Sequence, residues 1–217
     1  MSTTVPLSGR RAQAARNDEV ILDAAREVFV DDPGAPIAAV AQRAGVGISA
    51  LYRRYKSKEE LLQKLCADGL EIYNSCVAAA LEELDAADDP REVFARFMRR
   101  VVDADTHSLT MRLAGTFHPT EAHLTGAQRA GELNVRLVDR LHDVGAIRPD
   151  LVVADLGQIF EMVAAIRFGD DERRGQLRHR YLALLLDGML SGRRQEMPGP
   201  PPFLGEFASR WVMTDDK

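Results

Sequence analysis

The segment from residue 37 to residue 58, IAAVAQRAGVGISALYRRYKSK, restricts the possible folds of this chain more than any other. It holds two short helical patterns that meet at Gly45, where a left-handed backbone carries no Cβ penalty. The first pattern has an inner apolar stripe of Ile37, Val40, Ala41 and Ala44. The second runs from Gly47 to about Arg54, with Leu51 and Tyr55 on its inner face. Two short helices around a glycine turn predict a helix-turn-helix, whose second helix enters a DNA major groove.

The outer and N-terminal surface of the second pattern indicates which side chains would meet DNA. The residues left on that surface are Ile48, Ser49, Ala50, Tyr52 and Arg53. In a helix-turn-helix, such positions face base edges and phosphates. The next four residues, Ser57-Lys58-Glu59-Glu60, form a capping box that begins a long helix. We expect Lys58 and the first amide groups of that helix to bind a phosphate.

The distribution of charge favours a nucleic-acid surface at the N-terminal end. The chain has 217 residues and a formal net charge of -5. Residues 1–17 and 33–58 together hold eight cations and no carboxylate, so the remainder carries -13. The cations of the first stretch are Arg10, Arg11 and Arg16, which we expect to lie in a disordered tail in the free protein. The functional interpretation adds that they contact phosphate or a minor groove when DNA is bound. A basic patch on an acidic body concentrates the attraction to phosphate in one place.

Helical periodicity predicts an all-α fold for the whole chain. The expected helices cover residues 17–30, with Asn17 as N-cap, and then 57–84, 89–106, 109–117, 121–144, 151–168 and 171–191. In the last of these, we expect one apolar stripe of Leu177, Tyr181, Leu184 and Leu185, which Leu182, Leu186, Met189 and Leu190 widen. The last two helices have wider apolar arcs than one core requires, which predicts a homodimer interface through about 151–168 and 171–191.

Four segments follow from these patterns. Residues 1–16 are expected to be a basic flexible arm and 17–60 a three-helix DNA-binding domain. Residues 61–195 form a larger helical body, and 196–217 form a proline-rich linker with a short helix at about 203–213. The segment 203–213 either docks on the body or partner, or stays disordered.

Nothing in the sequence indicates an enzyme, a metal site or a cofactor. The five histidines lack the i, i+4 pairing of a helical metal site, and no nucleophile elbow or phosphate-binding loop is present. Ten helical residues place Cys66 and Cys76 about 15 Å apart, too far for a disulfide. Two free thiols suit a cytoplasmic protein, with a redox sensor as the alternative. No apolar run approaches the length of a membrane span.

The residues from Asn17 to Leu62 resemble the TetR family of bacterial transcriptional repressors. The resemblance rests on ILDAAREVF in the first helix and on IAAVAQRAGVGISALYRRYKSKEELL after it. It implies an all-α homodimer with a small N-terminal helix-turn-helix domain and a larger C-terminal helical domain for ligand binding and dimerisation. The implied partners are a palindromic double-stranded DNA operator and a small-molecule effector that releases it.

The same resemblance implies particular DNA contacts and shows three departures from the family pattern. The positions that contact DNA in the family correspond to Ser49, Ala50, Tyr52, Arg53, Arg54 and Lys58. Gly47 replaces a frequent Ser or Thr, Ile48 a frequent Lys, and Ala50 a frequent Thr. Ile48 and Ala50 can contact a thymine methyl group but cannot donate a hydrogen bond. We therefore expect Ser49 and Arg53 to be the hydrogen-bonding readers.

A ligand cavity in the body is implied by the resemblance, and its lining is predicted from polar residues within apolar helical stretches. These candidates are Tyr73, Arg112, His118, Asn134, Glu161 and Arg167. A buried polar group needs a partner, and a ligand can supply it. Structural hydrogen bonds or exposure are the alternative for each residue. The alternative for the whole chain is a helical small-molecule-binding or interaction protein without DNA binding.

Overall fold

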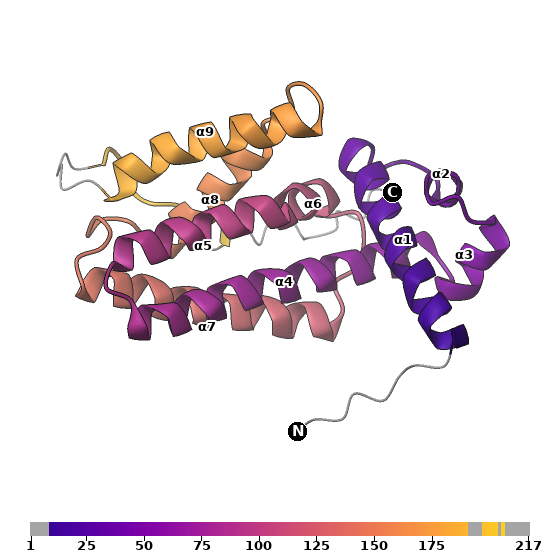
Figure 1. Cartoon of the computed structure of the whole chain (residues 1–217), viewed down its shortest axis with the longest axis horizontal. Helices are drawn as coiled ribbons and strands as arrows, with labels where there is room; N and C mark the ends of the chain where they lie inside the picture. Colours follow the sequence, from indigo (N-terminus) through magenta and orange to yellow (C-terminus); the bar gives the residue numbers. More distant parts are fainter. Residues whose placement is uncertain (1–8, 191–196, 204, 207–217) are drawn as a thin grey trace. The chain divides into compact units, whose positions relative to one another are not determined.

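The computed structural model describes residues 9–190, 197–203 and 205–206, and within these it omits the side chains of residues 9–15, 108 and 110–112. The described residues form nine α-helices, which confirms the all-α prediction (Figure 1). The chain divides into two compact units, Met1–Leu65 and Cys66–Lys217, here called unit 1 and unit 2. The division falls within one long helix, α4 (Lys58–Ala86).

The first helix, α1 (Gly9–Asp31), begins eight residues before the predicted N-cap Asn17. The expectation of a flexible arm up to residue 16 is therefore wrong from Gly9 onward, while residues 1–8 lie outside the described part. The added segment, GRRAQAAR, has several strong helix formers and no proline, so it continues the helix toward the N-terminus. The buried stripe of α1 holds Ile21, Ala24, Ala25 and Phe29.

The helix-turn-helix is formed by α2 (Ile37–Arg43) and α3 (Ile48–Arg54). Gly45 has a φ of +65°, as predicted for the turn. The amide of Val46 donates to the Ala41 carbonyl at 3.0 Å, and the amide of Gly45 donates to the Gln42 carbonyl at 3.2 Å. These two bonds form a Schellman motif, which satisfies carbonyl groups that the end of α2 would leave unpaired. The turn thus sets the direction in which α3 leaves α2.

The start of α4 has the predicted capping interaction in a modified form. The Ser57 hydroxyl accepts from the Glu60 amide at 3.0 Å. The Glu60 carboxylate accepts from the amide of Lys56 at 2.6 Å, one residue earlier than in the standard capping box. Two amide groups at the junction of α3 and α4 are therefore satisfied by side chains.

The core of unit 2 is built around α5 (Pro90–Ala104), whose start is as predicted. Asp89 is the N-cap and accepts from the amides of Arg91 and Glu92, with Pro90 at the first helical position. All members of the expected stripe are buried, namely Val93, Phe94, Phe97, Val101 and Val102. Asp105 ends α5 in a left-handed conformation, with a φ of +48°. The following α6 (Thr106–Leu113) therefore begins three residues earlier than expected.

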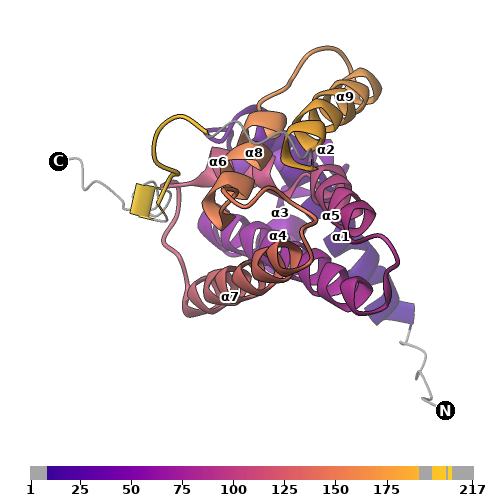
Figure 2. The ribbon, with the colours of Figure 1, turned by 90° about the vertical axis from the view of Figure 1, so that its left-hand side faces the viewer.

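The helix α7 (Glu121–Asp143) has nearly the predicted bounds, and α8 (Val153–Ala164) is shorter than the expected 151–168. The carbonyl of Ala164, at the end of α8, accepts a hydrogen bond from Arg178 of the next helix at 3.0 Å. Within unit 2, α8 packs against α5, α6, α7 and α9, and Figure 2 shows it between α7 and α9. It therefore contacts four other helices of the body.

The wide apolar arc of α9 (Asp171–Leu190) is divided between the core and the surface. Its buried residues are Arg178, Leu182, Leu186 and Met189. Tyr181 and Leu184, of the first predicted stripe, are exposed, because the helix turns toward the core the side that holds Leu182, Leu186 and Met189. The predicted C-terminal helix at 203–213 lies almost entirely outside the described residues. No helix of the described part is long and apolar enough to cross a membrane.

Candidate nucleic-acid interface and ligand site

The recognition helix α3 is anchored from one side and open on the other. Leu51 is fully buried, and Tyr55, at the C-cap, is buried as well. Ile48 is 40% exposed and Tyr52 is 47% exposed. Ser49 and Arg53 are exposed, Ala50 is partly buried, and Gly47 is the exposed N-cap. The structure therefore places the predicted base-reading residues on the outer side of one short helix.

Arg54 lies differently from Arg53, because Asp18 of α1 binds its guanidinium group. The Nε and Nη2 atoms of Arg54 donate to the two carboxylate oxygens of Asp18, each at 2.7 Å. The Tyr55 hydroxyl donates to the same carboxylate at 2.7 Å. The pKa of Asp18 lies below its usual value, mainly because Arg54 donates hydrogen bonds to the carboxylate. The carboxylate thus stays ionised and connects α1 to the C-terminal end of α3.

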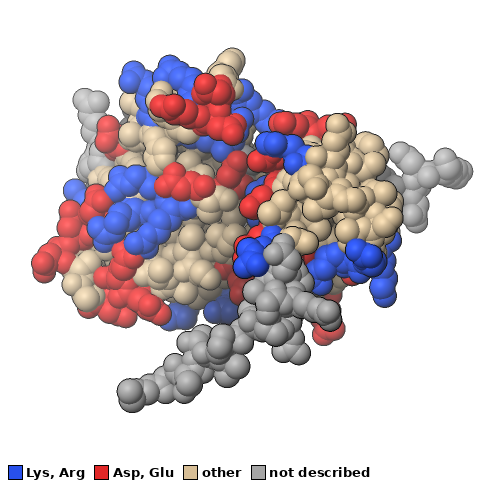
Figure 3. Space-filling model, turned by 45° about the vertical axis from the view of Figure 1, so that its right-hand side comes forward, with Lys and Arg blue, Asp and Glu red and all other residues tan. Residues whose placement is uncertain are grey.

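A second acid of α1 pairs with the other helix of the motif, since Glu27 forms an ion pair with Arg43 at the end of α2. The sequence suggested a basic patch without carboxylates. In the folded protein, Asp18 and Glu27 pair with two of the five cations between residues 33 and 58. Figure 3 shows Lys and Arg next to Asp and Glu at several places on the visible face, with broad uncharged areas between them. In the sequence, the sign of these ion pairs was that the first helix carries acids, including Asp18 and Glu27, close to its buried stripe.

Lys58 also makes an intramolecular contact. Its Nζ atom donates to the Pro33 carbonyl at 2.7 Å and lies 5.0 Å from the centre of the Phe29 ring. These contacts hold the ammonium group near the turn between α1 and α2. An ammonium group has three donors, so a phosphate contact remains chemically possible beside the carbonyl contact.

Two of the predicted ligand-site residues meet in the interior of unit 2. The Tyr73 hydroxyl, on α4, donates to the Asn134 side-chain oxygen, on α7, at 2.9 Å. Burial raises the pKa of Tyr73 above its usual value, so the hydroxyl remains a donor at neutral pH. The Tyr73 ring makes edge contacts with the rings of His107 and Phe160. Sequence reasoning missed His107, which has no distinctive neighbours in the chain.

The other predicted ligand-site residues are placed less centrally. His118 and Arg167 are exposed, and Glu161 is partly buried. Arg112 lies in α6, and its side chain falls outside the described part. The structure therefore brings Tyr73 and Asn134 together in the interior of unit 2.

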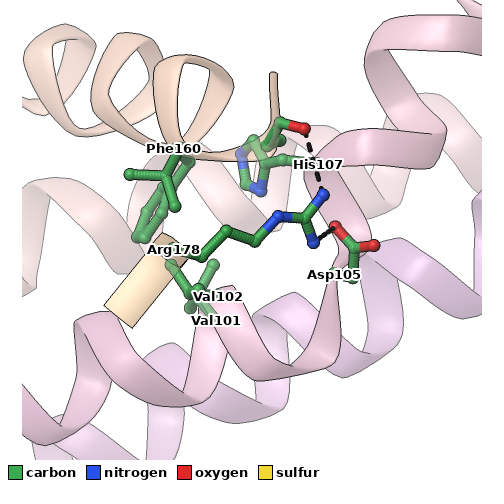
Figure 4. Close-up of a pocket in the computed structure, with 8 residues that line it drawn as sticks. Val101, Val102, Asp105, His107, Phe160 and Arg178 are labelled. Atoms are coloured by element: carbon green, nitrogen blue, oxygen red, sulfur yellow. Dashed lines mark hydrogen bonds and ion pairs between the residues drawn. The ribbon is translucent and has the colours of Figure 1, made fainter. Parts of the chain in front are cut away.

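A buried ion pair lies close to the aromatic rings and was also missed. Arg178 of α9 binds Asp105 at 2.8 Å and donates to the Ala164 carbonyl (Figure 4). A cavity of ≈ 10 Å³ lies beside it, lined also by His107, Phe160 and four aliphatic residues. This volume is about the minimum for one water molecule, so an organic ligand requires the helices to open. The sequence did contain a sign of this burial, because Arg178 lies four and eight residues before Leu182 and Leu186 and therefore on the same face of the helix.

The thiols and potential metal ligands give no further site. Cys66 and Cys76 are free, and burial raises the pKa of the Cys66 thiol to about 12. A thiol with so high a pKa is a poor nucleophile at neutral pH, which disfavours the redox-sensor alternative for Cys66. Among the described residues, no group of three or more His, Cys, Asp or Glu could hold a metal ion.

Comparison with known proteins places this helix-turn-helix within one family. Residues 21–65 match the family model of bacterial regulatory proteins of the tetR family. The HTH-type transcriptional repressor LfrR of Mycolicibacterium smegmatis (strain ATCC 700084 / mc(2)155) is 35% identical over 97 residues. That match covers 45% of this chain and 46% of the relative, so it spans about half the length of the curated protein. Residues 21–65 of this chain are therefore similar to the DNA-binding region of bacterial regulatory proteins of the tetR family.

Solved structures extend the similarity of fold to the helical body. The TetR-like regulator LfrR from Mycobacterium smegmatis, in complex with proflavine, aligns with a TM-score of 0.63 at 19% identity. The alignment covers 84% of this chain and 99% of that one. A TetR transcription regulatory protein from Mycobacterium vanbaalenii aligns with a TM-score of 0.56 at 24% identity, over 83% and 99% of the two chains.

Proposed function

We propose that this protein is a homodimeric transcriptional repressor that binds a palindromic DNA operator and is released by a small-molecule effector. The observation that carries the proposal is the outer side of α3, where Ser49, Tyr52 and Arg53 are exposed around a fully buried Leu51. A seven-residue helix held in this way offers side chains to a major groove without losing its own core contacts. The similarity to the repressor LfrR supports the same function.

In the proposed complex, the two α3 helices of a dimer enter successive major grooves, about 34–36 Å apart in the simplest arrangement. Ser49 and Arg53 hydrogen-bond to base edges, and Ile48 and Ala50 contact thymine methyl groups. Tyr52 and Lys58 bind phosphates, while Gly47 lets the backbone approach the DNA closely. The operator is palindromic because a two-fold dimer presents the same reader twice.

Exposed apolar side chains near the C-terminal end support the homodimer. Met162 of α8 and Tyr181 and Leu184 of α9 are each about half exposed or more, and Phe168, between the two helices, is more exposed still. A group of large apolar side chains on two adjacent helices is costly in water and typical of a protein interface. Pairing with a second copy would cover the side of α9 that turns away from the core.

The proflavine that one fold relative binds supports an effector site in unit 2. Tyr73 and Asn134 satisfy each other by a hydrogen bond of 2.9 Å, so an effector that used them would have to replace that bond. The cavity beside Arg178 is too small for an organic molecule, so an effector that binds there would have to separate α8 from α6 or α9. One continuous helix, α4, begins directly after α3 and reaches Tyr73. An effector that shifts α4 would move the reader, and DNA and effector would then weaken each other's binding reciprocally.

The DNA-binding proposal predicts that Arg53→Ala weakens operator binding at least tenfold. The operator is first identified by selection from a random-sequence duplex library with the wild-type protein. Arg53 carries a full positive charge on the outer side of α3, so its loss removes about one unit from the log–log salt slope of binding. Mobility-shift titrations at several salt concentrations measure both quantities.

Arg91→Ala is the matched control for that experiment, because Arg91 is an exposed cation at the start of α5 and far along the chain from α3. It should leave affinity and slope unchanged. If the wild-type protein enriches no sequence, the interaction-protein alternative replaces the repressor. If it does bind, one duplex should carry two chains, and palindromy should appear in the enriched sequences.

The dimer proposal predicts that Leu184→Glu raises the dimer dissociation constant at least tenfold. Leu184 is 60% exposed in the single chain, and the dimer would bury the new charge twice without a partner. Sedimentation velocity over a concentration series measures the change. Leu124→Glu, at a residue of α7 that is 64% exposed, is the matched control and should leave the association unchanged. A wild-type protein that sediments as a monomer throughout would show that the exposed residues serve another purpose.

A further inference from the structure

We propose that Arg54 is a positioning residue, which fixes α3 through Asp18 of α1, and that it is not one of the phosphate ligands. The inference rests on the proposed DNA-binding function and changes one of its contacts. It assigns different roles to two adjacent arginines, Arg53 and Arg54, which the sequence alone treats as one basic run. It also gives Asp18, a residue outside the helix-turn-helix, a role in DNA reading.

The first argument is the geometry of the ion pair. Two parallel N–H groups of Arg54 meet the two oxygens of Asp18, both at 2.7 Å. This side-on, bidentate arrangement is the strongest form of an arginine–carboxylate contact and also the most directional. The Asp18 side chain is only 17% exposed, and the Tyr55 hydroxyl gives it a third hydrogen bond. The carboxylate is therefore shielded from water and held by three hydrogen bonds, although the Arg54 side chain is itself 55% exposed.

The second argument is charge. A phosphate ligand contributes to binding by neutralising a phosphate charge and releasing the counterions condensed around it. The charge of Arg54 is already balanced by Asp18, whose pKa the guanidinium holds below its usual value, so the carboxylate is ionised at any pH used for binding. A phosphate that approached the remaining N–H groups of Arg54 would meet a neutral pair and would also lie near a carboxylate.

The third argument is the size of the element that must be held. α3 has seven residues, about two turns, and a helix of this length has no stability of its own in water. Its N-terminal end is fixed by the Gly45 turn, and Leu51 anchors its middle. Arg54 and Tyr55 are its last residue and its C-cap, and both bind Asp18. The ion pair therefore completes a three-point attachment that sets the angle at which the outer residues meet a groove.

Arg53→Met and Arg54→Met form a matched pair for the test, since both remove one guanidinium from neighbouring positions of the same helix. With the duplex selected by the wild-type protein as the probe, Arg53→Met should reduce the salt slope by about one unit. Arg54→Met should reduce affinity about tenfold at every salt concentration, with the slope unchanged. A slope that falls by about one unit in Arg54→Met would overturn the proposal and restore Arg54 as a phosphate ligand.

A second measurement needs no DNA. Hydrogen exchange of the α3 amides in the full chain should be at least about fivefold faster in Arg54→Met and in Asp18→Asn than in the wild type. The double variant should exchange no faster than the faster single variant, because both substitutions break the same contact. Arg53→Met should match the wild type.

These two measurements separate the inference from the function on which it rests. If the wild-type protein selects no duplex, the proposed function fails, and exchange at α3 still tests the attachment through Asp18. If exchange is unchanged in both Arg54→Met and Asp18→Asn, the ion pair does not hold α3, and the proposal is wrong even when DNA binding is intact.

Discussion

Replacing Arg178 by methionine is expected to lower the free energy of unfolding by about 3 kcal/mol. The Arg178 side chain is almost completely buried and joins three helices of unit 2, through Asp105 at the end of α5 and the Ala164 carbonyl at the end of α8. Methionine has a similar length but no donor, so the substitution leaves a carboxylate and a carbonyl group without a charged partner. Asp105 is one-third exposed and can recover part of its hydration, which keeps the loss near the lower end of the range for buried pairs.

Urea unfolding followed by far-ultraviolet circular dichroism measures the effect. Arg180→Met, two residues further along the same helix at an exposed position, is the matched control and should change stability by less than about 0.5 kcal/mol.

Asp105→Asn tests the pair from the other side and keeps a residue that tolerates the left-handed conformation at this position. It should destabilise at least as much as Arg178→Met, because the buried Arg178 guanidinium keeps its charge and loses its carboxylate partner. Equal stability of wild type and Arg178→Met would show that the pair contributes no net stability.

The elements predicted well are those whose signals are local in the sequence. Asp89 and Pro90 determine the start of α5, and Gly45 determines the turn, because each acts through its own backbone or through amides within three residues. Apolar spacing also placed the buried stripe of α5, since the rest of that helix is strongly polar. In these cases, the structure that the local sequence prefers is also the one that buries the apolar residues in the core.

The orientation of α9 could not be predicted in the same way, because its apolar arc is wide enough to allow two faces. Leu177 and Tyr181 on one side compete with Leu182 and Leu186 on the other, and only the packing of α5 and α8 decides between them. Arg178 is buried because it lies on the same side of α9 as Leu182 and Leu186, which face the core. Sequence periodicity gives the width of an apolar surface, and the partners of that surface determine which part is covered.

The candidate DNA site shows the same limit for charge. The sequence showed where cations gather, but the acids that bind Arg43 and Arg54 are 16 and 36 residues away along the chain. A count of charges in a segment cannot include such partners. The number of cations available for phosphates is therefore smaller than the basic run suggests, and it depends on the contacts of α1.

His107 is expected to make the protein less stable as the pH falls, because burial keeps its imidazole neutral in the folded state. The ring packs against Tyr73 and Phe160, and this burial lowers the pKa of His107 to about 4, from 6.5 in a model peptide. Between these values the folded protein keeps the imidazole neutral, while the unfolded chain binds a proton. The unfolded state is thus stabilised by protonation as the pH falls from about 6.5 to about 4, and stability is lost over that window.

The size of this effect follows from the shift and can be isolated with one substitution. Between pH 7 and pH 5, the wild type should lose about 2 kcal/mol more than His107→Gln, which cannot be protonated. Urea unfolding at the two pH values gives the difference. His118→Gln is the matched control, because His118 is exposed to solvent in the folded protein, and it should keep the pH dependence of the wild type.

If His107→Gln retains the full pH dependence, then the imidazole takes up a proton in the folded state, and Asp105 is the nearby group able to stabilise it. That result would place a cation beside the Tyr73–Asn134 pair and would favour an anionic effector. Loss of the pH dependence would instead leave an uncharged, aromatic surface there, which favours a neutral or aromatic effector. The protonation state of this one ring therefore constrains the chemical class of the molecule that the proposed repressor senses.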